Sequence, residues 1–300
     1  MTDLRHIVSG PRAVRLGMFL GGHVPEGMGR RLSRWGAGLV CRLRPAVYRI
    51  VHANLQQVLG PGASREELEQ KARQVFYYAL RGYFDLFRAL HLPVEQLAAQ
   101  VDLPGETRLA ARTLWNREGG AIVVFPHLSN FDLGGHAFLS LLPETQLFTL
   151  PDPSPGFQMI NESRNREGVA ITPLSSAALR QAIRLLRRGG VVAVAGDRPV
   201  SDLDEPVPFF GRPAPVPSGH VRLAVKTGAA VAIAYCILSP ETNRYTMYLE
   251  PAMDLIRTGN QDEEVALNLR RILDALERVI SRWAEQWLMF VPVWPELMQG

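Results

Sequence analysis

The sequence predicts an α/β protein with a largely parallel sheet flanked by helices, preceded by a helical N-terminal region. Through residue 118 the apolar residues recur at helical spacing, whereas after Gly120 short apolar runs alternate with helical segments. Such alternation is typical of parallel strands covered on both faces. The chain has 300 residues, 47% of them hydrophobic, and no internal repeat, so it can bury a sizeable core. We expect a helical region over residues 1–118 and an α/β core over 119–300, packed as one compact domain.

The N-terminal region divides into helices at its proline, glycine and capping residues. Pro45 separates two predicted helices, and the Gly60-Pro-Gly62 stretch ends the second. Ser64 and Glu67 form a capping box that opens a long helix, whose aromatic residues we assign to the core. The predicted helices are residues 27–44, 46–59, the long helix through Phe87, a short helix from Pro93, and 106–118.

The α/β core has clear strand and helix boundaries. Pro126 ends the first strand because proline cannot donate to a sheet ladder. Ser176 is expected to cap one helix, and the apolar tail from Leu288 to pack against the body. The predicted strands are 121–125, 146–150, 169–172, 191–195, 230–238 and 245–249, and the predicted helices are 157–166, 177–188, 219–227, 263–286 and one that begins after Asn130.

Charge and cysteine content narrow the classes of function. Cys41 and Cys236 match no metal or redox spacing, so a reducing compartment is expected. No uncharged run reaches the length of a transmembrane helix, so the chain is not expected to span a membrane. The formal net charge is only +4 and no nucleic-acid-binding motif occurs, so nucleic acid is not an expected partner.

The basic residues concentrate near the N-terminus. The first fifty residues carry nine arginines against only Asp3 and Glu26. A basic, amphipathic helical region of this kind is typical of contact with an anionic membrane surface. A solvated helix face would give the same pattern, and the sequence leaves both interpretations open.

The strongest chemical signal is His127 followed five residues later by Asp132. Positions five apart on one helix point away from each other, so the pair can meet only if the histidine precedes the helix. Asn130 is the expected N-cap of that helix, which would put Asp132 in its first turn. A carboxylate bonded to one ring nitrogen would make the histidine a general base. The alternative is an ordinary loop histidine and an aspartate that merely favours a helix N-terminus.

Further polar residues follow other predicted strands. Ligands of open α/β sheets bind at the carboxyl ends of the strands, so Thr149, Asp197 and Arg198 can share one rim with His127. Arg164, on the helix after the second strand, could join them. A base and two arginines around one cleft suit an acceptor hydroxyl near a phosphate or sugar. Alternatively, Arg164 is a surface ion partner and Asp197-Arg198 a turn-stabilising pair.

Several ordered blocks make the chain resemble the bacterial lipid A biosynthesis (lauroyl/myristoyl) acyltransferases. This family groups with the phosphatidylinositol mannoside acyltransferases and, more distantly, with the glycerolipid acyltransferases. The matching blocks are His127-Leu-Ser-Asn-Phe-Asp132, Glu162-Ser-Arg164 before Gly168, Gly196-Asp197-Arg198, and Val207-Pro-Phe-Phe-Gly211 with Pro217-Ser-Gly219, together with Arg49-Ile-Val-His-Ala-Asn54-Leu55 upstream.

The resemblance implies a glycerolipid-acyltransferase-like fold and site roles. His127 would deprotonate the acceptor hydroxyl and Asp132 would orient His127. The residues expected to contact the acceptor head group or the donor are Arg164, Asp197, Arg198, Asn130 and Thr149.

The function that the resemblance implies is transfer of a fatty acyl chain from acyl-CoA or acyl carrier protein to a hydroxyl of a membrane glycolipid, either phosphatidylinositol mannoside-like or lipid A-like. Because a thioester is already activated, a base and oxyanion donors suffice, and no cofactor or metal is expected. We expect a peripheral enzyme on the cytoplasmic face of the inner or plasma membrane. The alternatives are a non-catalytic peripheral lipid-binding protein and a thioester hydrolase.

Overall fold

A seven-stranded sheet organises the computed structural model, which describes residues 11–117, 119–139, 141, 144–149, 158, 169–200 and 205–298. The strand order is β1-β9-β8-β2-β5-β3-β4, and every neighbouring pair is parallel except β8 and β9. The largely parallel α/β fold is thus confirmed. The strands are β1 (Val101–Asp102), β2 (Ala121–Phe125), β3 (Thr145–Thr149), β4 (Val169–Pro173), β5 (Val191–Ala195), β8 (Ala230–Leu238) and β9 (Tyr245–Leu249).

The longer strands were predicted to within one residue at each end, since each is a short apolar run. Strand β1 was not predicted, because a pair of residues has no periodicity. It precedes residue 119 yet pairs with β9, so the sheet takes a strand from the N-terminal part of the chain.

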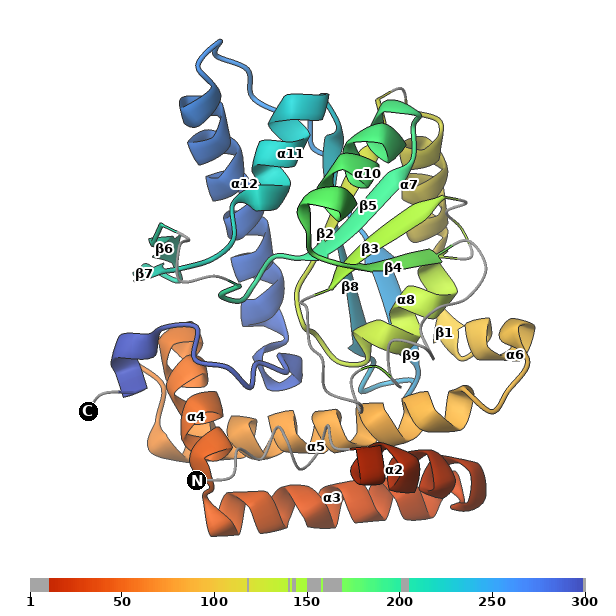
Figure 1. Ribbon diagram of the computed structural model, residues 1–300. Coiled ribbons are helices and arrows are strands. Elements are labelled where there is room, and N and C mark those ends of the chain that lie inside the picture. Colours follow the sequence, from red (N-terminus) through yellow and green to blue (C-terminus); the bar gives the residue numbers. More distant parts are fainter. Residues whose placement is uncertain are drawn as a thin grey trace.

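The N-terminal helices form a layer beside the sheet, with α5 between the sheet and the pair α2 and α3 (Figure 1). Helix α5 starts at the predicted cap, where the Ser64 hydroxyl accepts a 3.1 Å hydrogen bond from the Glu67 amide. Helices α3 and α5 approach so closely that a Cβ on Gly29 would lie 2.3 Å from the Phe84 ring. This layer consists of α2 (Pro11–His23), α3 (Glu26–Leu43), α4 (Ala46–Leu59) and α5 (Arg65–Ala89), followed in the chain by α6 (Val94–Ala98). Helix α7 (Gly105–Trp115) lies outside this layer and packs against β9 of the sheet.

The remaining helices cover the sheet, and one predicted cap was wrong. Ser175, not Ser176, caps α10, because its hydroxyl accepts a 3.1 Å hydrogen bond from the Ala178 amide. The helix predicted over 157–166 lies outside the described residues, apart from the single residue 158. The helices are α8 (Phe131–Leu139), α10 (Ser176–Arg187), α11 (Gly219–Thr227) and α12 (Gln261–Arg282), and the short elements are β6 (Val207–Phe209), β7 (Arg212–Ala214), η1 (Ala284–Gln286) and η2 (Pro295–Met298).

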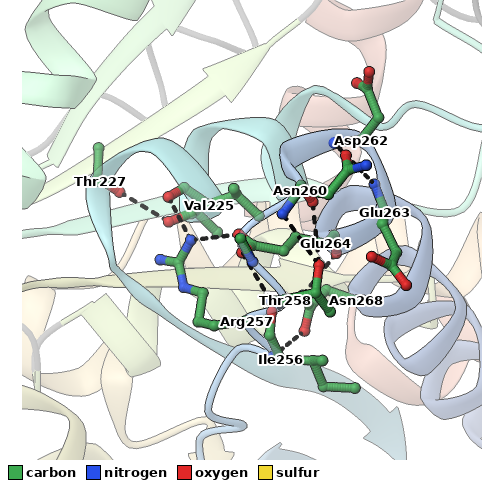
Figure 2. Close-up of polar contacts among 12 residues, drawn as sticks. Val225, Thr227, Ile256, Arg257, Thr258, Asn260, Asp262, Glu263, Glu264 and Asn268 are labelled. Carbon is green, nitrogen blue, oxygen red and sulfur yellow. Dashed lines mark hydrogen bonds and ion pairs between the residues drawn. The ribbon is translucent and has the colours of Figure 1, made fainter.

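A polar cluster at the start of α12 holds α11 and α12 together (Figure 2). The Asn260 side chain caps α12 by accepting hydrogen bonds from the amides of its first turn. The buried Glu264 carboxylate accepts from Arg257, whose guanidinium also donates to the Val225 carbonyl oxygen in α11. The orientation of α11 is therefore tied to that of the long C-terminal helix.

The C-terminal tail packs against the body, as expected from its apolar sequence. Asn54 of α4 is buried, and its amide nitrogen donates to the carbonyl oxygens of Met289 (3.2 Å) and Val291 (2.8 Å). Its amide oxygen accepts from the Val293 N–H at 3.2 Å. The N-terminal layer and the tail are thereby joined. None of the helices in the described part of the chain combines the length and hydropathy that a bilayer crossing requires.

Candidate active site

The site begins where two neighbouring parallel strands end. In the register of β2 with β5, Phe125 lies opposite Ala195, so both chains leave the sheet at the same edge. The Gly196 amide donates to the Phe125 carbonyl oxygen at 3.1 Å. A Cβ on Gly196 would lie 2.5 Å from Val124 Cγ1, so this turn has no room for a side chain. The geometry brings His127 and Asp197 together.

Asp197 is fully buried and receives three hydrogen bonds. Its Oδ1 accepts from His127 Nδ1 at 2.6 Å, and its Oδ2 accepts from the His127 amide at 2.7 Å and from the Trp287 indole at 2.8 Å. An ionised carboxylate only accepts hydrogen bonds, so Nδ1 carries the ring proton and Nε2 keeps a free lone pair. This is the tautomer that a general base requires.

The charge of Asp197 is stabilised inside the protein. Burial alone would raise the pKa of this carboxyl, but the His127 charge and the hydrogen bonds from His127 and Trp287 hold the pKa below its ordinary value. Asp197 therefore stays anionic at neutral pH and can stabilise the positive charge that His127 gains when it takes a proton.

The predicted partner of His127 needs correction. We expected Asp132 to orient the ring and Asp197 to contact substrate, yet Nδ1 is engaged by Asp197, which fixes the tautomer. Because β5 lies beside β2, a carboxylate seventy residues further along the chain reaches the ring. Asp132 lies in the first turn of α8, as predicted, and lines the same cavity as His127.

Asn130 lines the cavity and has a structural role in its wall, while its predicted substrate contact stays a prediction. Its side-chain oxygen accepts a 3.1 Å hydrogen bond from the Leu133 amide, which confirms the predicted N-cap. Its amide nitrogen donates to the Gly82 carbonyl oxygen of α5 at 2.9 Å. The side chain is buried and both of its polar groups are used by the protein.

The other predicted residues lie at the cavity or outside the described chain. Thr149 ends β3 and lines the cavity, with a buried hydroxyl for which the described part of the chain provides no hydrogen-bond partner. Arg198 also lines the cavity, next to Asp197. Arg164 lies outside the described residues. Across the part of the chain that the structure describes, no group of three His, Cys, Asp or Glu side chains could hold a metal ion.

A cavity of about 1810 Å³ starts at His127 and reaches the N-terminal helices. Its walls are mostly apolar, which suits a hydrocarbon chain better than a polar metabolite. Representative lining residues are Val14 and Leu20 of α2, Leu32, Trp35 and Val40 of α3, Phe76, Leu80, Phe84 and Phe87 of α5, Phe131 of α8 and Leu147 of β3.

The C-terminal segment after α12 fixes the turn that carries His127, and no local sequence pattern indicates this contact. The Ser129 amide donates to the Gln286 carbonyl oxygen, and the Leu288 amide donates to the His127 carbonyl oxygen, both at 2.8 Å. Ser129 has a φ of 49°, a left-handed conformation that is costly for serine. The Gln286 side chain accepts a hydrogen bond from the Leu238 amide and donates one to the Leu238 carbonyl oxygen. The C-terminal segment is therefore itself anchored to β8.

His220, in the first turn of α11, lines the cavity wall, as do His127 and His136. It is 6% exposed, and among the described residues neither of its ring nitrogens has a hydrogen-bond partner. Burial lowers the pKa of His220 to about 4, so the ring is neutral at physiological pH.

We expect His220 to make folding sensitive to acid. The unfolded histidine has a pKa of about 6.5, so between that pH and about 4 the unfolded chain binds a proton that the folded chain does not. The free energy of unfolding should therefore fall as pH falls, by about 2 kcal/mol between pH 7 and pH 5 from this residue. Urea unfolding of the wild type and His220→Phe measures the difference. Identical pH dependence in the two proteins would contradict the expectation.

Comparisons with known proteins agree with the resemblance seen in the sequence. Residues 7–296 match the profile of the bacterial lipid A biosynthesis acyltransferases. The phosphatidylinositol mannoside acyltransferase of Mycobacterium tuberculosis (strain ATCC 25618 / H37Rv) is 27% identical over 252 residues, which are 80% of this chain and 75% of that protein. The enzyme of the same name from Mycolicibacterium smegmatis is 24% identical over 298 residues, 98% of this chain and 91% of that one.

A solved structure, the 1-acyl-sn-glycerophosphate acyltransferase PlsC from Thermotoga maritima, aligns with 85% of this chain and 99% of its own, at 16% identity and a TM-score of 0.37. The assignment rests on the family match, which spans nearly the whole chain. The protein belongs to the bacterial lipid A biosynthesis acyltransferase family and is an acyltransferase that acts on lipids.

Proposed function

We propose that the protein transfers a fatty acyl chain from an acyl thioester, acyl-CoA or acyl carrier protein, to a hydroxyl of a membrane glycolipid. The acceptor is phosphatidylinositol mannoside-like or lipid A-like, in line with the names of the relatives and the family. One observation carries the proposal: a histidine oriented by a buried carboxylate stands at the wall of a long apolar cavity. The base and the space for an acyl chain are thus adjacent.

In the proposed reaction, His127 Nε2 takes the proton of the acceptor hydroxyl as its oxygen attacks the thioester carbonyl carbon. The C–O bond forms and the carbonyl π electrons move to oxygen, giving a tetrahedral oxyanion. When the carbonyl re-forms, the C–S bond breaks, and the thiolate takes the proton from the His127 imidazolium. The products are an ester and a free thiol, and Asp197 stays ionised throughout.

Binding of the acyl chain and the head group in the cavity would determine which substrates react. Burying each methylene of the acyl chain is worth about 0.8 kcal/mol, so the apolar walls hold the donor while its thioester faces the base. We propose that Asp132, Thr149 and Arg198, which line the cavity with His127, contact the acceptor head group. Arg164 keeps the same predicted role. Neither a metal nor a cofactor is part of the proposed reaction.

The proposal includes peripheral docking on the cytoplasmic face of an anionic membrane through α2 and α3. One face of α3 exposes large apolar side chains, with Trp35 and Leu43 each 69% exposed. Leu32 and Trp35 also line the cavity, so the cavity that would hold the acyl chain opens on this face of α3. The apolar stripe of α3 consists of Met28, Leu32, Trp35, Leu39 and Leu43, is continued on α2 by Leu16 and Phe19, and is flanked by the exposed arginines Arg31, Arg34 and Arg42.

The reaction is tested by substitutions at His127 and Asp197. His127→Ala removes the base and should lower transfer roughly 10²–10⁴-fold. In Asp197→Asn the side-chain amide can donate to Nδ1, which moves the ring proton to Nε2 and should cost roughly 10³–10⁴-fold. Ester formation is measured by mass spectrometry with palmitoyl-CoA and a phosphatidylinositol mannoside or lipid A precursor.

Trp287→Phe is the matched control for disturbance of the turn, because it removes one hydrogen bond to Asp197 and leaves the base in place. It should retain activity within roughly tenfold of the wild type. Near-full activity of Asp197→Asn, or free fatty acid appearing at the same rate with and without glycolipid, would refute the transfer reaction as written. Thioester that is bound but never consumed would indicate a lipid-binding protein.

Membrane docking is tested with vesicles of phosphatidylglycerol and phosphatidylcholine. Trp35→Ser removes a large side chain from the apolar stripe and should weaken sedimentation with vesicles about tenfold or more. The control is Leu109→Ser on α7, which removes an apolar side chain that is 66% exposed but lies outside the stripe. Equal binding of all three proteins, or no preference for the anionic vesicles, would count against docking through α3.

A further inference from the structure

Part of the cavity wall is a groove between α10 and α11, formed by elements remote from the α3 stripe. Leu179 and Ile183 of α10 line one side, and Leu223 of α11 lines the other. Leu179 is 42% exposed, so the groove reaches the protein surface. A surface opening on this side gives the cavity a route for a ligand that arrives from solvent.

The inner end of the groove is marked by His220. A methyl group on Gly196 would lie 3.8 Å from His220 Cε1, and Gly196 directly precedes the carboxylate that orients His127. Both ring nitrogens of His220 are buried in the cavity wall, and no described residue forms a hydrogen bond with either of them. An unpaired buried polar group is costly, so a ligand that supplies the missing hydrogen bonds gains affinity.

The character of the missing ligand group follows from the imidazole. A neutral ring has one N–H donor and one acceptor nitrogen, and burial disfavours its charged form. The matching ligand group is therefore an uncharged donor or acceptor. An amide qualifies, because it can either accept from the ring N–H through its C=O or donate to the other ring nitrogen through its N–H.

The outer end of the groove is cationic. Lys226 and Arg222 line the cavity on the same face of α11, and both are exposed. Arg222 pairs only loosely with the exposed Asp262, at 3.4 Å, and no ion pair is found for Lys226 among the described residues. The helical rise of about 1.5 Å per residue puts Lys226 roughly 9 Å beyond His220 along the axis. These charges favour an anionic group at the mouth.

We propose that the α10–α11 groove binds the phosphopantetheine arm of the acyl donor. Its phosphate would lie at Arg222 and Lys226, an amide at His220, and the thioester beside His127. The arm is shared by CoA and acyl carrier protein, and its order of phosphate, amides and sulfur matches the order of groups along the groove. The assignment rests on the proposed use of an acyl thioester.

Binding of hexadecyl-CoA, a thioether that cannot react, tests the groove directly by calorimetry. His220→Phe should weaken binding by up to about tenfold through loss of the neutral hydrogen bond to the amide, and His220→Asn, which keeps a donor and an acceptor, should stay within about threefold. Lys226→Glu should weaken binding about threefold to tenfold at low salt and less at high salt. The matched control is Arg112→Glu, an exposed arginine of α7 away from the cavity, which should leave binding unchanged.

Kinetics distinguish the arm from the rest of the donor. p-Nitrophenyl palmitate delivers the same acyl chain without the arm, so the ratio of kcat/KM for palmitoyl-CoA to that for this ester should fall by up to about tenfold in His220→Phe. An unchanged ratio, unaltered hexadecyl-CoA binding, or an equal loss in His220→Phe and His220→Asn would overturn the groove assignment.

Two further outcomes distinguish binding of the phosphopantetheine arm from alternative interpretations. If Lys226→Glu weakens adenosine 3′,5′-diphosphate as much as hexadecyl-CoA, the cations bind the nucleotide and the phosphate position is wrong. If the variants change hexadecyl-CoA binding as expected but no acyl donor supports transfer, the groove assignment is supported and the proposed acyl transfer is refuted.

Discussion

The structure of the site depends on one buried carboxylate. Asp197 has no contact with water, so its charge is tolerable only while its hydrogen bonds are made. They come from two distant parts of the chain, the turn after β2 and the segment after α12. The geometry of the His127 turn and the packing of the C-terminal segment are therefore coupled, since both supply hydrogen bonds that stabilise the same buried charge.

The cavity follows from the same arrangement. Because the sheet edge that carries His127 faces α5, residues of α3 and α5 line the same cavity as His127. Asn130 connects the two layers, since it caps α8 and also donates to a carbonyl oxygen of α5. Asn130 thus sets the distance between the His127 turn and the helices that line the cavity.

Sequence reasoning succeeded where local pattern decides structure. Apolar runs such as Ala121–Phe125 gave the strands, and Ser64 gave a helix start, because neighbours in the chain determine both. It failed where the order of strands in the sheet determines which side chains meet. No local sequence pattern indicates that β5 lies beside β2. The nearby Asp132 was therefore preferred to Asp197 as the partner of His127. Trp287, ninety residues beyond Asp197, gave no signal for the same reason.

The tail has a consequence for synthesis of the protein. Gln286, Trp287 and Leu288 secure the turn around His127, and Asn54 holds the residues that follow them. All of the tail leaves the ribosome after the sheet and the helices are complete. A nascent chain that already contains His127, the strands and most of the cavity walls still lacks the residues that hold the imidazole in place. The arrangement around His127 is therefore completed only after the segment that follows α12 has been synthesised.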